Sequence, residues 1–450
     1  MRMAIVGAGS SRLPLMLGSL ARSGGEAGLS EVTLFDIRPD RIETLLPVAR
    51  AVGEVCGVLP SLEVAARVEE ALEGADVVLF TVRPGFEEAR ARDERACLDR
   101  GTLGQETTGA AGMAFATRSV PVLLDYCRQA QRLAPGFLPL VFTNPAGLVT
   151  QALVEEGFEH AVGICDSAME AARNVGSRAG IPMTELDFRV HGLNHLSWTT
   201  AVRHGDRDLL AAALDDREWT RHQVPWAPDL PATLGRIPNE YLYYWYCAEK
   251  ALAALRREPF SRGEVLAREN PRMLREVRKA LAQGAHREAI LRYGRWLRDR
   301  TRTYMACSRG GADVDLPDFR TADEAIAWLS TRLEGYAEVA MDLIRGRTRA
   351  LPHPMALNVP GNGAISAFDP TDVVESDCTV APDGVRPRAR GPLPPEDLAW
   401  MTRVKEFERR TIRGIRERNR DRLVEALVAH PLVGRRDLAM DLVGVLDLGF

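Results

Sequence analysis

Two short polar segments of the sequence carry the side chains best suited to bind a metal ion. Cys165 and Asp166 follow one short apolar run, and His195 follows another. One thiolate and one imidazole on the same ion would leave several coordination positions open for substrate oxygens, as a catalytic metal requires. The alternatives are structural: a buried cysteine, a satisfied core histidine, and a capping box formed by Ser167 and Glu170.

The N-terminal segment carries a glycine turn of the kind that binds a nucleotide. Gly7, Gly9 and Ser10 lie between a strand pattern and a helical pattern, so their backbone amides can approach a pyrophosphate at the helix N-terminus. Asp36 ends the second strand pattern, where an acid accepts hydrogen bonds from a ribose and favours NAD over its 2′-phosphorylated form. A tight turn without ligand, and an acid that caps the turn at Arg38, are the alternatives.

Three further segments contain candidate functional residues. Asn144 ends another strand pattern and could direct its amide at a hydroxyl group, although Asn-Pro is also common in turns. The polar, glycine-bounded stretch 104–109 is hard to explain as core. The aromatic run 241–246 is by default a packed helical stripe, so a role for any one phenol as a base needs further support.

The elements that must position these residues follow from the hydrophobic pattern. In the first two hundred residues, β-branched apolar runs alternate with amphipathic helical patterns, which is typical of a parallel sheet covered by helices. Strands are predicted at Met3–Val6, Val32–Phe35, Val77–Val82, Leu138–Phe142, Ala161–Ile164 and Phe188–Val190, and helices at Leu15–Ala21, Arg41–Val52, Phe86–Asp99 and Ala114–Leu133.

The second half of the chain has a different pattern of apolar and charged residues. Arg- and Glu-rich amphipathic segments predict helices between residues 241 and 304, one helix over about 323–345 and a long helix over about 396–430. A short extended stretch is predicted at 355–359. The expected fold class is therefore α/β, with a Rossmann-like, doubly wound, mostly parallel sheet in residues 1–190. A mainly helical α+β second domain is expected in residues 191–450.

Composition excludes several classes of protein. With 58 Lys and Arg against 62 Asp and Glu, the net charge of −4 provides no basic excess for nucleic acid or a membrane surface. No apolar run approaches the ~20 residues of a membrane helix, and the N-terminus does not have the pattern of a signal peptide. Seven cysteines without framework spacing suit reduced thiols. We expect a folded cytoplasmic protein with no nucleic-acid or membrane partner.

Together the motifs resemble glycoside hydrolase family 4, whose members depend on NAD and a divalent metal. The resemblance covers nearly the whole chain, and it implies a lactate/malate dehydrogenase-like architecture and a homodimer or homotetramer. The matching segments are, in order, 7–11, 82–85, 90, 93–94, 104–109, 143–146, 163–166, 192–195, 238–244, 362–365 and 430–432.

The resemblance implies roles at the metal and at the base. Cys165 and His195 are implied to be ligands of a divalent metal, for which Mn²⁺ is the usual ion of the family. Tyr241 is implied to be the base. Asn144 and Asn194 are implied to contact the sugar or a metal-bound water.

The resemblance also implies where the rest of the substrate and the cofactor bind. Arg83 resembles the arginine that members acting on sugar 6-phosphates keep, and Arg90 belongs to the same matching region. A small sugar phosphate is therefore the expected substrate. The glycine turn and Asp36 are implied to bind NAD.

The implied reaction begins with transfer of a hydride from C3 of the sugar to NAD⁺, and the resulting ketone acidifies the proton on C2. Tyr241 would remove that proton, and the aglycone would leave C1 by elimination. Asp166 or water would protonate the leaving oxygen. Water then adds to C1 and the hydride returns to C3, so NAD is regenerated in each turnover.

Several alternatives stay open. The surroundings of the glycine turn and of Tyr241 resemble the 6-phospho-β-glucosidase branch, but Asp166 is typical of 6-phospho-α-glucosidases. Departures from the family pattern at Arg12, Phe86 and 332–335 also leave open a member acting on unphosphorylated glycosides, or a non-catalytic protein that binds NAD or a sugar phosphate. A 2-hydroxy-acid dehydrogenase is a further alternative, although such enzymes need no Cys/His metal pair.

Overall fold

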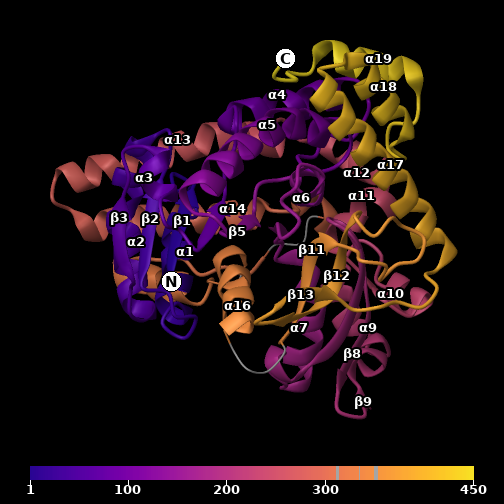
Figure 1. Cartoon of the computed structure of the whole chain (residues 1–450). Helices are drawn as coiled ribbons and strands as arrows, with labels where there is room; N and C mark the ends of the chain where they lie inside the picture. The colour runs from indigo at the N-terminus through magenta and orange to yellow at the C-terminus, as the bar shows by residue number, and fades with distance from the viewer. Residues whose placement is uncertain (311–313, 334, 349–352) are drawn as a thin grey trace.

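A computed structural model describes residues 1–310, 314–333, 335–348 and 353–450 (Figure 1). Within these ranges, thirteen strands form one mixed sheet, in the order β10-β8-β7-β12-β11-β6-β5-β4-β1-β2-β3, with β13 beside β12 and β9 beside β8. The segment β3-β2-β1-β4-β5-β6 is entirely parallel and has the strand order 3-2-1-4-5-6 of dinucleotide-binding sheets. The predicted fold class is confirmed.

Most strands of the parallel half are buried, and only the edge strand β3 is largely exposed. β1, β4 and β5 are almost wholly buried and read as continuous apolar runs, because helices cover both sides of the sheet. The strands of this half are β1 Arg2–Val6, β2 Glu31–Phe35, β3 Ser61–Val64, β4 Val77–Phe80, β5 Leu138–Val141 and β6 Val162–Gly163. Its helices are α1 Leu13–Ser23, α2 Pro39–Cys56, α3 Val68–Leu72, α4 Phe86–Asp99, α5 Gly109–Leu133, α6 Ala146–Glu155 and α7 Ser167–Ala179.

The rest of the sheet is antiparallel and comes from two distant parts of the chain. β11 pairs with β6, and β12 lies between β11 and β7. The strands are β7 Asp187–Leu193, β8 Leu196–His204, β9 Arg207–Asp208, β10 Ile237–Pro238, β11 His353–Pro360, β12 Val373–Ala381 and β13 Gly384–Pro387. The predicted domain boundary at residue 190 falls within β7, and the division into two domains stays a prediction.

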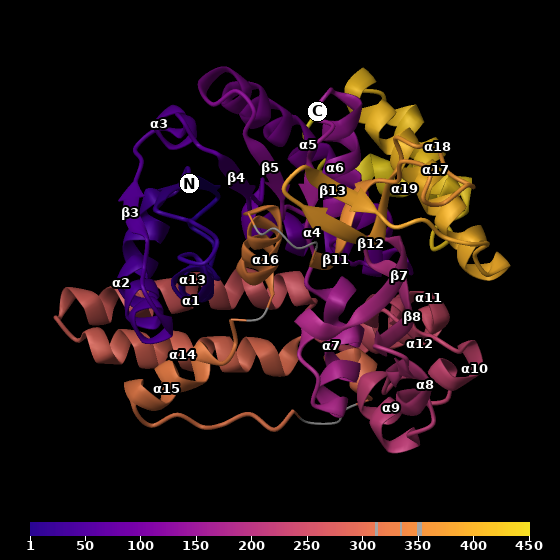
Figure 2. The ribbon, with the colours of Figure 1, turned by 60° about the horizontal axis from the view of Figure 1, so that its bottom comes forward.

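Among the remaining helices, two groups pack on the first half of the chain. In Figure 2, α13 and α14 lie side by side, and both contact α2. The helices α17, α18 and α19 gather near the C-terminus, against α4 and α5 (Figure 1). The bounds are α8 Leu209–Leu214, α9 Arg217–Gln223, α10 Leu230–Leu234, α11 Tyr243–Tyr246, α12 Ala248–Arg257, α13 Arg262–Ala282, α14 His286–Thr303, α15 Ala322–Ser330, α16 Tyr336–Thr348, α17 Pro395–Glu417, α18 Arg420–Ala429 and α19 Arg436–Val445.

Two predicted helices are in fact pairs of helices. The segment 323–345 is divided between α15 and α16, and the segment 396–430 between α17 and α18. The second break has a clear local cause, because Arg418 adopts a left-handed conformation with φ of 48° and Asn419 caps the next helix through its side chain. In the part of the chain that the structure describes, no helix is long and apolar enough to cross a bilayer.

Candidate active site

Three predicted site residues from three different elements meet at one imidazole ring. Cys165 lies between β6 and α7, His195 lies in the turn between β7 and β8, and Tyr241 lies in a short 3₁₀ helix after β10. The Sγ atom of Cys165 is 3.4 Å from Nε2 of His195. The phenol ring of Tyr241 stacks on the same imidazole with ring centroids 3.7 Å apart and an interplanar angle of 12°. The structure therefore brings the predicted metal ligands and the predicted base together.

Hydrogen bonds from the start of α7 hold this group in place. The hydroxyl of Ser167 lies 3.1 Å from Sγ of Cys165 and accepts a hydrogen bond from Nδ2 of Asn239. Oδ1 of Asn239 in turn accepts a hydrogen bond from the backbone N–H of Tyr241. Because Ser167 is used in this way and α7 begins after Asp166 without a side-chain cap, the capping-box alternative is wrong.

Burial sets the protonation of the two predicted ligands. It raises the pKa of the Cys165 thiol well above its usual value, and the charges of Asp166 and Glu375 add to this effect. Burial lowers the pKa of His195 to about 3, against the opposing charge of Glu106. The pair is therefore a neutral thiol and a neutral imidazole at pH 7, and a cation is needed to make the thiolate.

The donor set fits a divalent metal. In zinc sites, metal–nitrogen and metal–sulfur bonds measure ~2.1 and ~2.3 Å, so two donor atoms 3.4 Å apart are close enough to share one ion. Among the described residues, no group of three or more His, Cys, Asp and Glu side chains is placed to hold a metal. The protein would therefore contribute a thiol and an imidazole and leave the other positions to substrate or water.

Asp166 lies beside this pair without capping a helix. Its Oδ1 atom is 3.9 Å from Sγ of Cys165. Burial raises the pKa of the carboxyl group, and the positive charge of Arg12 opposes the shift. A buried carboxyl group whose pKa is raised is suited to hold a proton, as a general acid must.

Tyr241 begins a chain of hydrogen bonds that includes two residues not predicted from the sequence. Its hydroxyl lies 2.7 Å from the hydroxyl of Tyr304, which donates a hydrogen bond of 2.6 Å to Oε1 of Glu240. Burial, together with the nearby charge of Glu170, raises the pKa of Glu240 to about 8. Tyr304 is 63 residues from Tyr241 and carries no motif that would have pointed to it.

A cavity of about 290 Å³ opens beside this group. Its lining includes the predicted cofactor residues Gly7, Gly9, Ser10 and Asp36 together with the predicted substrate residues Arg83, Arg90 and Asn144. Cys165, His195, Tyr241 and Asn194 do not belong to the lining. The loop 104–109 joins the two regions, because Glu106 lines the cavity and Thr107 contacts His195.

The glycine turn has the close packing that a dinucleotide site needs. Gly7 has a φ of 95°, and a Cβ atom there would lie 2.6 Å from the carbonyl oxygen of Thr81. A Cβ atom on Gly9 would lie 2.8 Å from the Asp36 carboxylate. Any larger residue at either position would disturb the approach of the backbone to a ligand.

The carboxylate of Asp36 holds the backbone of two turns and can also bind a ribose. Its two carboxylate oxygens accept hydrogen bonds of 2.8 Å from the backbone N–H groups of Gly9 and Arg38. Each oxygen keeps a further lone pair for a ribose hydroxyl at the cavity wall. Burial raises the pKa of Asp36, against these two hydrogen bonds. Asp36 therefore does cap the turn at Arg38, and this role leaves room for a ribose contact.

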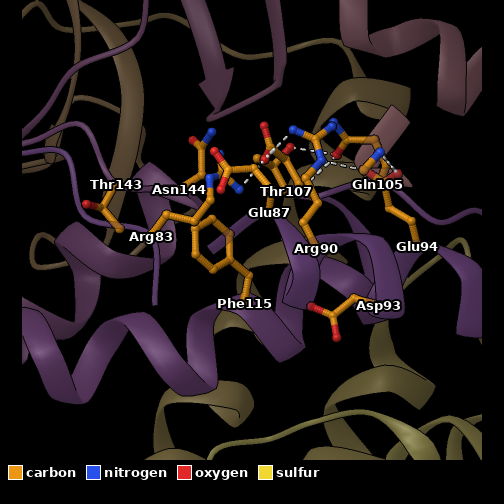
Figure 3. A network of polar contacts seen from close by, with 12 residues as sticks. Arg83, Glu87, Arg90, Asp93, Glu94, Gln105, Thr107, Phe115, Thr143 and Asn144 are labelled. Carbon is orange, nitrogen blue, oxygen red and sulfur yellow. Dashed lines mark hydrogen bonds and ion pairs between the residues drawn. The ribbon is translucent and has the colours of Figure 1, made fainter. Parts of the chain in front are cut away.

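Arginine side chains and Glu106 form a charged wall of the cavity. Arg83 and Arg90 both donate hydrogen bonds to Oε2 of Glu106, at 2.8 and 2.7 Å, and Arg90 also donates to Glu94 (Figure 3). Burial alone would raise the pKa of Glu106, but the two guanidinium groups lower it to about 2. The wall keeps two fixed cations beside Asn144, which is suitable for an anionic sugar.

Asn194 lies in a polar cluster that the sequence did not indicate. Its Nδ2 donates to Oε1 of Glu375 on β12, which also accepts from Asn358. Ser197 donates to the other carboxylate oxygen at 2.6 Å. The carboxylate of Glu375 is wholly buried, and it fixes the orientation of the Asn194 amide next to His195.

Two of the segments that depart from the family pattern lie near the site. Phe86 has a φ of 53° and lines the cavity, with the guanidinium groups of Arg38 and Arg41 near its ring. Within 332–335, residue 334 lies outside the described residues, and a Cβ atom on Gly335 would lie 3.0 Å from Oδ2 of Asp166.

Known proteins resemble the chain over its full length. The 6-phospho-beta-glucosidase BglT of Thermotoga maritima is 25% identical over 450 residues, which cover 98% of this chain and 97% of the relative. The structure of the 6-phospho-beta glucosidase from Thermotoga maritima with manganese, NAD⁺ and glucose-6-phosphate has a TM-score of 0.78 at 22% identity, and covers 99% of this chain and 97% of that one. A 6-phospho-alpha-glucosidase from gut microorganisms in complex with NAD and Mn²⁺ has a TM-score of 0.78 at 23% identity, with the same coverage.

Family models account for both halves of the sequence. The model described as "Family 4 glycosyl hydrolase" matches residues 2–180, and the model described as "Family 4 glycosyl hydrolase C-terminal domain" matches residues 190–433. These two matches leave only short segments of the chain outside them. The chain therefore belongs to family 4 of the glycosyl hydrolases.

Proposed function

We propose that the protein hydrolyses the glycosidic bond of 6-phosphoglycosides, with 6-phospho-β-glucosides as its preferred substrates. One observation carries the proposal. Sγ of Cys165 lies 3.4 Å from Nε2 of His195, and the Tyr241 ring stacks on this imidazole with centroids 3.7 Å apart. The group lies beside a cavity lined by a dinucleotide-type glycine turn. A plain 2-hydroxy-acid dehydrogenase has no use for the thiol–imidazole pair, and a silent binding protein has no use for a base stacked on it.

The cofactor and the metal have separate places in this proposal. Gly7, Gly9, Ser10 and Asp36 would hold NAD in the cavity, and Cys165 with His195 would hold a divalent metal, for which Mn²⁺ is our choice. When bound, the nicotinamide supplies reversible hydride transfer and the metal supplies polarisation of a sugar oxygen. Similar structures contain NAD with manganese, which supports both assignments.

The side chains of the protein would move the protons. Tyr241 would remove the proton from C2 of the sugar, and its proton can leave along the hydrogen-bonded chain to Tyr304. Asp166 would protonate the departing oxygen at C1, since burial raises the pKa of its carboxyl group. Asn144 and Asn194 would orient sugar hydroxyls or water.

The charged wall supports a phosphorylated substrate. Arg83 and Arg90 would bind the 6-phosphate, and both are within hydrogen-bond distance of Glu106, which holds their guanidinium groups in place. The β preference is the finer part of the proposal. Relatives named for β- and for α-glycosides are similarly distant, so a 6-phospho-α-glucoside is the second candidate, favoured by Asp166 after the metal cysteine.

A panel of four substrates tests the proposal. We expect p-nitrophenyl 6-phospho-β-glucoside to be cleaved, with NAD⁺ and Mn²⁺ under reducing conditions, faster than the α-anomer and faster than either unphosphorylated glycoside. NADH should not accumulate, because the hydride returns within each turnover. Stoichiometric formation of NADH, or no cleavage of any of the four, would contradict the proposal. Faster cleavage of the α-anomer would correct only the anomeric preference.

The assembly and the compartment are part of the same proposal. We place the protein in the cytoplasm as a homodimer or homotetramer, with an NAD-binding domain in residues 1–190 and a substrate and oligomerisation domain in residues 191–450. Sedimentation of the purified protein gives the number of subunits directly, and a monomer at micromolar concentration would contradict that part.

A further inference from the structure

The loop 104–109 connects the cofactor cavity to the Nδ1 side of the His195 ring, and the proposed function leaves the side chains of Gln105 and Thr107 without a role. Gln105 is buried, and Thr107 approaches His195 from the side opposite to Cys165. The hydroxyl of Thr107 lies 2.6 Å from Nδ1 of His195. Figure 3 shows Gln105 and Thr107 beside the Arg90 network from which this loop extends.

The direction of each hydrogen bond in this loop can be derived in order. The backbone N–H of Thr107 is a donor, and it donates to Oε1 of Gln105 at 2.8 Å, which fixes the oxygen end of that amide. The same oxygen lies 2.7 Å from Oγ1 of Thr107 and can only accept, so the Thr107 hydroxyl donates its one proton to it. Toward His195, Oγ1 of Thr107 must therefore act as an acceptor.

We propose that Gln105 and Thr107 are positioning residues that hold His195 in the tautomer with the proton on Nδ1, so that the lone pair of Nε2 points at the metal position beside Cys165. The opposite tautomer would require the Thr107 hydroxyl to donate to Gln105 and to Nδ1 at once, and it has one proton. Stacking on Tyr241 fixes the plane of the ring but does not choose between the nitrogens. The metal role of the pair rests on the proposed function, whereas the tautomer does not.

The chemistry of imidazole ligands explains why such a lock is useful. A histidine binds a metal through an unprotonated nitrogen, and the hydrogen bond made by the other nitrogen selects which one is free. Without the acceptor, a fraction of the molecules would carry the proton on Nε2 and would have to lose it from there before binding. Loss of such an outer hydrogen bond typically weakens metal affinity by about 10- to 100-fold.

Nitrogen-15 spectroscopy of the metal-free protein, labelled in its eight histidines, reads the tautomer directly. The His195 signals are assigned by their loss in His195→Asn. We expect a protonated Nδ1 and an unprotonated Nε2 in the wild type at pH 7. A protonated Nε2 would overturn the proposal, and the tautomer itself is read from the wild-type protein.

Three variants test which atoms are responsible. Thr107→Val removes the acceptor without changing the shape, and we expect a mixture of tautomers and Mn²⁺ binding weaker by about 10- to 100-fold in calorimetry. Thr107→Ser restores the hydroxyl and should restore both. Gln105→Leu does not alter the contact with His195, but it frees the Thr107 proton, so the population with the proton on Nε2 should rise.

A matched control and the contrary results complete the test. Thr108→Val makes the same change at the next residue of the loop, where Nδ1 keeps its Thr107 partner, and should leave the tautomer and Mn²⁺ affinity unchanged. An unchanged tautomer in both Thr107→Val and Gln105→Leu would overturn the proposal. If His195→Asn bound Mn²⁺ as tightly as the wild type, the metal site of the proposed function would be wrong. The spectra of the wild type would still decide the tautomer.

Discussion

At the scale of single residues, position at the end of a strand was the informative signal. Cys165 follows β6 and His195 follows β7, and the folded sheet brings their side chains to 3.4 Å. Tyr304 and Glu375 also belong to the site, but no pattern in the sequence pointed to them. Each makes its contact through the fold alone, since 63 residues separate Tyr304 from Tyr241, and Glu375 is 181 residues from Asn194.

We expect loss of the Tyr241 hydroxyl to lower turnover without changing the affinity for NAD⁺. Tyr241→Phe removes the oxygen that would take the C2 proton but keeps the ring stacked on His195, so turnover should fall by roughly two to four decades while NAD⁺ affinity stays nearly unchanged. The wild type should place deuterium at C2 of the product in D₂O, which mass spectrometry detects. Unlabelled product, or a fully active variant, would contradict the role.

Cys165 is expected to be required because its thiolate would hold the metal. Cys165→Ala should abolish activity and Mn²⁺ binding, and oxidation of the thiol should do the same, because an oxidised sulfur is a poor ligand. Cys127→Ala is a matched control, since this buried cysteine lies within α5, away from the pair. Calorimetry with Mn²⁺ and hydrolysis assays measure the two effects. Full activity of a metal-free Cys165→Ala protein would rule out the assignment.

Asp166 is expected to act on the leaving group. As the general acid, Asp166→Asn should slow substrates with poor alkoxide leaving groups far more than p-nitrophenyl substrates, whose leaving group needs little protonation. The structure excludes a side-chain cap as the reason for this acid, because α7 begins without one. Rates of the variant on a natural disaccharide phosphate and on the p-nitrophenyl substrate are compared. Equal slowing of the two would remove Asp166 from the catalytic residues.

At the scale of elements, apolar runs predicted the parallel strands β1, β2, β4, β5 and β6, because these strands are largely buried. The parallel edge strand β3 was not predicted, because it is mostly exposed and has no apolar run. β12 was not predicted, although it lies between β7 and β11, because Glu375, Ser376 and Asp377 interrupt its apolar pattern. Their burial is made acceptable by partners from other elements, such as the backbone N–H of Val190, which donates to Asp377. A strand stabilised by distant partners carries no local signal.

The break between α17 and α18 provides a test at this scale. Oδ1 of Asn419 accepts a hydrogen bond from the backbone N–H of Arg422, and this cap starts the second helix. Asn419→Ala should lower the free energy of unfolding by about 1 kcal/mol in urea, whereas Asn419→Asp keeps the acceptor and should lower it much less. If Asn419→Ala and Asn419→Asp lower the free energy of unfolding equally, the helix is not stabilised through this side chain.

At the scale of the whole molecule, composition indicated a folded chain and the hydrophobic pattern indicated an α/β fold, but neither indicated how its halves hold together. The second-half helices α13 and α14 pack on α2, and α13 also packs on α4. Glu87 on α4 accepts hydrogen bonds from Arg41 on α2 and from Asn270 on α13. This carboxylate therefore joins three helices from both halves, an arrangement that no local pattern of charges could have predicted.

The Glu87 junction predicts how stability depends on pH. Burial alone would raise the pKa of Glu87, but the charge and hydrogen bonds of Arg41 and the amide of Asn270 lower it to about 2 from an ordinary value of 4.5. A carboxyl group whose pKa is lower in the folded state stabilises the fold above its unfolded pKa, and this contribution is lost as the pH falls from about 4.5 toward 2. The contribution at neutral pH is roughly 3 kcal/mol.

Urea unfolding of the metal-free protein at a series of pH values between 7 and 3 measures this contribution. The free energy of unfolding should fall as the pH drops below about 4.5, and Glu87→Gln should be less stable at pH 7 and show a shallower fall. Glu88→Gln is the matched control, because it makes the same change at the adjacent, exposed position and should keep the wild-type dependence. The same curve for Glu87→Gln and Glu88→Gln would mean that the junction does not join the halves through this charge.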